Sequence, residues 1–100
     1  LMDDLLSLRN FSAEGPVKTD VLRSEKFNIV LVCLEAGQEI PPHPEPYAVY
    51  FVVIEGQGVF TTGDGSFELA RESAISVGRD EIRGIRCVDR MVVLGVQDGH

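Results

Sequence analysis

Residues 37–58, Gly-Gln-Glu-Ile-Pro-Pro-His-Pro-Glu-Pro-Tyr-Ala-Val-Tyr-Phe-Val-Val-Ile-Glu-Gly-Gln-Gly, decide how the chain is interpreted. Prolines stiffen the first part of this stretch. Because proline cannot donate to the hydrogen-bond ladder of a sheet, this part belongs at a sheet edge or a barrel rim. The following residues, 48–54, are apolar and rich in β-branched and aromatic side chains, which predicts a buried strand. The stretch ends in Glu55-Gly56-Gln57-Gly58, where we predict a hairpin turn.

Short strand-like segments separated by glycine turns make up most of the remaining chain. We predict strands at residues 18–23, 27–35, 49–54, 59–62, 67–70, 74–77, 83–88 and 91–96. Strands at this spacing, without a long helical pattern, are typical of an antiparallel sandwich or barrel. The predicted fold class is therefore all-β, with a single antiparallel jelly-roll β-barrel. We place a short N-terminal arm at residues 1–16 and the barrel domain at residues 17–100.

Composition limits the classes of partner and the compartment. The net charge is −7, which argues against general nucleic-acid binding and against binding to anionic membranes, since both attract cationic surfaces. No apolar run approaches the length of a membrane span. Cys33 and Cys87 stand in apolar contexts without a Cys-x-x-Cys pair, so we expect small buried thiols and a reducing, cytoplasmic location.

The polar side chains of the opening stretch are the first candidates for a functional site. Strand side chains alternate between faces, so His43 and Glu45 point the same way. If the pairing continues in register, Phe51 shares that face, and it is expected in the core or lining a pocket. Tyr50, Val52 and Ile54 then lie on the opposite face.

The stretch resembles the first conserved motif of the cupins. Gly37, His43 and Gly56 fall on the motif's spacings, whereas Glu45 replaces its second histidine and Val49 replaces its glutamate. A second, weaker resemblance aligns Arg83 with the histidine of the second cupin motif, because Gly84-Ile85-Arg86 is similar to the residues that come after that histidine. A slip of one residue would place Ile82 there. The resemblance implies the jelly-roll barrel, and it implies that Val49 lies near the barrel mouth.

The resemblance also implies a metal site whose ligands are mostly replaced. A catalytic metal usually takes three or more protein ligands, and on this alignment only His43 and Glu45 remain. We therefore expect no cofactor and no tightly bound metal. If a divalent metal is present, His43 and Glu45 are its expected ligands, with Tyr47 or Tyr50 able to assist.

Our leading functional interpretation is a small cupin-like barrel that binds a small polar or carboxylate-bearing molecule at its mouth. The predicted ligand-binding residues are His43, Glu45, Tyr47, Phe51 and Arg83. We expect Glu45 to pair with Arg83 across the mouth, because a cation in place of a lost metal ligand would balance the carboxylate. One alternative is a metal-dependent cupin enzyme, of the isomerase or dioxygenase type, with unusual ligands. A second alternative is a structural dimer module.

The apolar residues 48–54 also indicate how the protein assembles. A strand that is apolar on both faces must be covered on both, so the face with Tyr50, Val52 and Ile54 needs either the N-terminal arm or a second subunit. We expect a homodimer, which the resemblance to cupins also implies.

Overall fold

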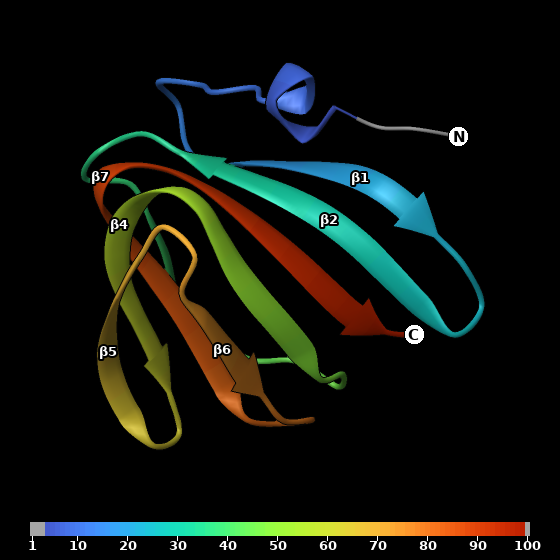
Figure 1. The fold of residues 1–100 in the computed structure, drawn as a ribbon. Coiled ribbons are helices and arrows are strands. Elements are labelled where there is room, and N and C mark those ends of the chain that lie inside the picture. Colours follow the sequence, from blue (N-terminus) through green and yellow to red (C-terminus); the bar gives the residue numbers. More distant parts are fainter. Residues whose placement is uncertain (1–3, 100) are drawn as a thin grey trace.

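The computed structural model describes residues 4–99, which form two layers of antiparallel strands with the N-terminal arm lying across one of them (Figure 1). The elements are a 3-10 helix η1 (Leu5–Leu8) and the strands β1 (Val17–Arg23), β2 (Phe27–Leu34), β3 (Glu39–Pro44), β4 (Val49–Thr62), β5 (Gly65–Ala70), β6 (Ala74–Val77) and β7 (Ile82–Asp98). The predicted all-β, antiparallel jelly roll is thus confirmed. In the described part of the chain, no helix has the length and apolar character to cross a membrane.

The two long strands, β4 and β7, bend and run through both layers, pairing with each other along most of their length. Residues 49–53 of β4 and 91–98 of β7 lie in the first layer, between β6 and β2. Residues 57–62 of β4 and 82–86 of β7 lie in the second layer, between β5 and β3. The first layer therefore has the order β1-β2-β7-β4-β6, and the second has the order β3-β7-β4-β5. The sheet is not closed, and β1 is one of its edges.

The hairpin turn predicted at residues 55–58 is wrong, because β4 continues through this segment. Its register against β7 shifts several times between Val53 and Gly58, which is where both strands bend from one layer into the other. Gly56 has a φ of 78°, and a Cβ at this position would collide with the carbonyl oxygen of Arg90 on β7. The glycines therefore permit a close crossing of two bent strands and do not reverse the chain. The strands predicted separately at 83–88 and 91–96 are likewise one strand, β7.

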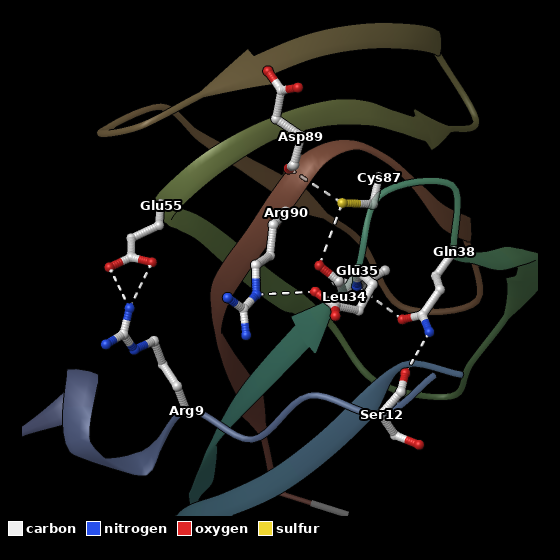
Figure 2. Close-up of polar contacts among 9 residues, drawn as sticks. All are labelled: Arg9, Ser12, Leu34, Glu35, Gln38, Glu55, Cys87, Asp89 and Arg90. Carbon is white, nitrogen blue, oxygen red and sulfur yellow. Dashed lines mark hydrogen bonds and ion pairs between the residues drawn. The ribbon is translucent and has the colours of Figure 1, made fainter. Parts of the chain in front are cut away.

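The main core fills the space between the layers. Its buried members are Val30, Val32, Leu34, Val49, Phe51, Val53, Phe60, Val77, Ile85, Cys87, Met91 and Val93. The rings of Phe51 and Phe60 lie 5.6 Å apart between their centroids, which joins the two halves of β4 across the core. Cys87 is buried, and its Sγ lies 3.4 Å from the carbonyl oxygen of Leu34 and 3.2 Å from that of Asp89 (Figure 2).

A second, smaller cluster lies on the outer face of the first layer, under the arm. We call Leu31, Cys33 and Val92 the outer cluster; Leu8 and Phe11 of the arm pack against it, together with Val21, Ile54 and Leu94. Polar contacts fix the arm in place (Figure 2). Arg9 forms an ion pair with Glu55 at 3.1 Å, and the Gln38 side chain donates to the Ser12 carbonyl at 2.6 Å. Arg90 stacks over the Phe11 ring.

The arm covers only part of the outer apolar face predicted from the sequence. Ile54 packs with the outer cluster beneath the arm, whereas Tyr50 remains 50% exposed. Leu1 and Met2, which belong to the predicted arm, lie outside the described residues.

Candidate functional site

A cavity of about 280 Å³ opens between the two layers and brings together all five of the predicted ligand-binding residues, His43, Glu45, Tyr47, Phe51 and Arg83. Its apolar walls include Val30, Val32, Ile40 and Ile85, and two further polar side chains, Lys18 and Gln97, also line it. Strand pairing explains part of this convergence. His43 on β3 pairs directly with Arg83 on β7, so both side chains lie on the same face of the second layer.

Arg83 is the most unusual residue of the cavity, because its side chain is charged and only 4% of the residue is exposed. Its Nη2 donates to the carbonyl oxygens of Gly78, at 2.9 Å, and Glu81, at 3.1 Å, while Nε also donates to Glu81 at 3.2 Å. The guanidinium lies 5.1 Å from the centroid of the Tyr47 ring. Nη1 is buried and has no hydrogen-bond acceptor within residues 4–99. One amino group of this buried cation therefore has no polar partner among the described residues.

The turn between β6 and β7 holds Arg83 in this orientation. The carboxylate of Glu81 accepts from the backbone of Gly78 at 2.8 Å and from that of Gly63 at 3.1 Å. The amide of Asp80 donates to the carbonyl of Glu45 at 2.8 Å, which ties this turn to the segment after β3. Because the turn is fixed at several points, its carbonyl groups form a stable anchor for the guanidinium.

His43, Glu45 and Tyr47 form the polar side of the cavity. His43 Nδ1 lies 2.8 Å from the carbonyl oxygen of Pro41, and Nε2 lies 3.3 Å from Glu45 Oε1. A carbonyl only accepts, so Nδ1 carries the hydrogen; Nε2 can donate to Glu45 only when the ring is protonated. Burial raises the pKa of Tyr47, and the negative charge and hydrogen bond of Glu45 raise it further, while Arg83 acts in the opposite direction. The Tyr47 hydroxyl therefore stays protonated at neutral pH.

The expected ion pair between Glu45 and Arg83 is not among the contacts of the described residues. Glu45 contacts His43 and Tyr47, whereas Arg83 is bound by the carbonyl groups of the turn that precedes it. The reason is local: Gly78 and Glu81 are close to Arg83 in sequence, and their carbonyl oxygens satisfy part of the guanidinium without the closure of a long loop.

The donor set of the cavity does not fit a metal centre. Within residues 4–99, no three side chains of the His, Cys, Asp or Glu type come together as a group that could hold a metal ion. His43 and Glu45 supply two donors, and the neighbouring strand β7 carries the buried cation of Arg83 in the same cavity, which repels another cation. Tyr50, considered above as an assisting ligand, lies half exposed on the outer face of the first layer.

Val49 does not lie at the cavity, contrary to the expectation from its place in the motif. It is 4% exposed in the main core, where it pairs with Val77 and Gln97. Phe51, two residues later on the same face, reaches the cavity instead.

Lys18 lines the cavity although the sequence pattern did not predict it there. Along β1, Val17, Thr19 and Val21 alternate with the polar Lys18 and Asp20, and this pattern alone assigns the polar side to solvent. Lys18 and Asp20 are indeed exposed, but Lys18 pairs directly with Val32 of the main core and so projects from the inner face of the sheet, whereas Val21 packs with the outer cluster under the arm. Lys18 consequently faces the cavity at the open edge of the first layer.

Comparisons with known proteins agree with this architecture. The family model for the cupin domain matches residues 30–96 of the chain. An RmlC-like cupin protein from Desulfovibrio desulfuricans is 31% identical, with a TM-score of 0.88 over 99% of this chain and 95% of that one. A protein from Thermus thermophilus is 24% identical, with a TM-score of 0.92 over 98% of this chain and 96% of that one.

A third structure, of an uncharacterized conserved protein with a double-stranded beta-helix domain from Klebsiella pneumoniae, shares the fold. It is 19% identical, with a TM-score of 0.89 over 98% of this chain and 89% of that one. No curated protein matches the chain. The family model spans well over half of the sequence, and the Desulfovibrio structure agrees over nearly its full length, so this chain belongs to the cupin family.

Proposed function

We propose that this protein binds a small carboxylate-bearing molecule in the cavity between its layers, without a tightly bound metal. The observation that carries the proposal is Arg83 Nη1, a buried cationic donor with no acceptor in the described part of the chain. Leaving a buried polar group unsatisfied costs about 1–3 kcal/mol, and more when the group is charged. A carboxylate oxygen would supply a charge-assisted hydrogen bond to this donor.

The rest of the cavity supports a ligand with a polar head and a small apolar body. The Tyr47 hydroxyl and His43 lie on the polar side, and Phe51, Ile85 and Val32 form apolar walls. The volume of about 280 Å³ is near the lower end of ligand pockets, which run from about 300 to 1,000 Å³. A metabolite of modest size fits this space better than a large cofactor.

The metal-dependent enzyme remains the alternative, and one observation favours it. The contact between His43 Nδ1 and the Pro41 carbonyl leaves Nε2 as the ring's electron-pair donor, facing Glu45. Histidines that ligate metals are commonly oriented in this way. Against this alternative stands the count of two donors beside a buried arginine, so we place it second. The unpaired, buried thiols of Cys33 and Cys87 support a reducing compartment for either function.

Binding of butyrate and of its neutral isostere butyramide tests the proposal. We expect butyrate, followed by NMR on isotope-labelled protein at constant ionic strength, to shift the amide signals of His43, Glu45 and Tyr47 and those of residues 83–85. Butyramide should leave these signals in place, because it lacks the charge that Arg83 requires. The Arg83→Gln variant should lose at least about tenfold in butyrate affinity, in line with a charged hydrogen bond of about 1.5–3 kcal/mol.

Arg86→Gln is the matched control, since Arg86 is an exposed arginine on the same strand and does not line the cavity. It should bind butyrate as the wild type does. The spectrum of Arg83→Gln, recorded first without ligand, establishes that the variant is folded. Butyrate binding that persists in a folded Arg83→Gln variant, or shifts that avoid the cavity, would contradict the proposal.

A further inference from the structure

Lys18 brings a second cation to the cavity that holds Arg83. It lies on the edge strand β1 and pairs directly with Val32, whose side chain is buried in the main core. Residues directly opposite each other in an antiparallel pair project to the same face, so Lys18 projects toward the interior of the jelly roll. The residue is nevertheless exposed, because β1 is an open edge of the sheet.

The charges around the cavity are not balanced. Among residues 4–99, the ion pairs involve Arg9, Arg23, Arg79, Arg90 and His43, and none of them involves Lys18 or Arg83. Glu45 is the carboxylate among the residues that line the cavity, and it already contacts His43 and Tyr47. The cavity therefore carries two cations, Lys18 and Arg83, against the one carboxylate of Glu45, which is a local excess of positive charge in a chain whose net charge is −7.

The two cations stand on different layers. Arg83 comes from β7 in the second layer, where it is deeply buried, and Lys18 comes from the edge of the first layer, where solvent reaches it. Apolar side chains, among them Val32 and Phe51, line the space that both cations share. This arrangement matches a ligand with charged groups at both ends and an apolar middle.

We infer that the ligand is a dicarboxylate, with one carboxylate bound at Arg83 Nη1 and the other near the open edge, against Lys18. The inference rests on the proposed function, and it adds the ligand class and a residue that selects it. Lys18 acts as a flexible point charge, so its contribution is smaller than that of Arg83.

A competing explanation of Lys18 is protection of the sheet edge. Inward-pointing lysines on edge strands discourage the addition of a strand from another molecule. That role predicts a change in self-association when Lys18 is replaced, and it predicts no change in ligand preference.

Succinate, glutarate and adipate, compared with butyrate under the same NMR conditions, test the inference. Glutarate is butyrate with a second carboxylate at its methyl end, and the other two diacids vary the span. We expect at least one diacid to bind at least about threefold more tightly than butyrate, which is the range of an exposed ion pair. The Lys18→Gln variant should reduce the affinity for that diacid to that for butyrate, while its affinity for butyrate stays the same.

Lys26→Gln is the matched control, because Lys26 is an exposed lysine between β1 and β2 that does not line the cavity. It should keep the diacid preference. Diacids that bind no more tightly than butyrate, or a preference that survives Lys18→Gln, would overturn the inference and leave the proposed function standing. A Lys18→Gln variant that only self-associates more strongly would favour edge protection instead. If neither butyrate nor any diacid shifts the cavity signals, the proposed function and the inference both fail.

Discussion

Replacement of Gly56 by alanine tests the continuous, bent strand β4. Gly56 has a φ of 78°, and an alanine forced into this left-handed region is destabilised by about 1–2 kcal/mol. Its Cβ would also meet the backbone carbonyl groups of Arg90 and Asp89, which cannot rotate away as a side chain can. Pushing β7 away from β4 at the bend adds a packing cost of about 1–3 kcal/mol. We therefore expect Gly56→Ala to lose about 2–5 kcal/mol of unfolding free energy, a large share of the roughly 5–15 kcal/mol of a typical domain.

Gly37→Ala is the control that measures only the cost of placing an alanine in the left-handed backbone region. Gly37 has a φ of 86°, but nothing lies within 4 Å of the position that its Cβ would occupy. Urea unfolding of both variants, with unchanged slopes, gives the two losses of free energy. Gly56→Ala should lose clearly more free energy of unfolding than Gly37→Ala. The difference measures the packing cost of a Cβ where β4 and β7 cross. Equal losses would mean that residues 55–58 form a free turn after all, and the account of the bend would be refuted.

Three further predictions concern the cavity and the surface. The chain has two tyrosines, so a titration of tyrosine absorbance with pH reports Tyr47 alone in the Tyr50→Phe variant. The midpoint of this titration should lie above pH 10.0. A midpoint at or below pH 10.0 would contradict a buried hydroxyl that is hydrogen-bonded to Glu45. Because the pKa of Tyr47 is higher in the folded than in the unfolded protein, its hydroxyl contributes to the free energy of unfolding fully below pH 10, and this contribution falls as pH rises through the folded pKa. Urea unfolding at several pH values should show this fall in the wild type and not in Tyr47→Phe. Protein purified without a His-tag should contain well under one transition metal per chain by elemental analysis; near-stoichiometric metal that is lost in His43→Ala would favour the enzyme. Sedimentation equilibrium should show a homodimer that Tyr50→Glu dissociates and that Phe67→Glu, on β5 of the second layer, does not. A monomer at all concentrations would leave the half-exposed Tyr50 face without a partner.

The fold could be predicted largely from local sequence, and the clearest error, the hairpin turn predicted at residues 55–58, has a physical cause. Alternating apolar residues and glycine turns specified the strands, and the spacing of Gly37, His43 and Gly56 indicated the family. The segment Glu55–Gly58 carries the same residues as a tight hairpin, yet it forms a bend. A glycine permits both conformations, and the choice between them depends on Arg90 of β7, which is distant in sequence.

The candidate site shows the same limit. Strand alternation, which the sequence reports, accounts for His43, Phe51 and Arg83 in the cavity, whereas Glu45 and Tyr47 reach it from the segment between the end of β3 at Pro44 and the start of β4. The partner of Glu45 was predicted wrongly, since the carbonyl groups that bind Arg83 come from a turn whose conformation no pattern revealed. Lys18 was missed because alternation along β1 does not say which face of this strand turns toward the main core, and the pairing of Lys18 with Val32 decides that.

The two cysteines occupy places that make them independent reporters of motion. Cys33 belongs to the outer cluster, against which Leu8 and Phe11 pack, so detachment of the arm removes part of its cover. Cys87 is enclosed between the layers, and burial also raises the pKa of its thiol, which keeps it in the unreactive form. A thiol reagent applied to the native protein would consequently react at two rates. The reaction at Cys33 would be fast and set by local opening of the arm, and the reaction at Cys87 would be slow and set by separation of the layers.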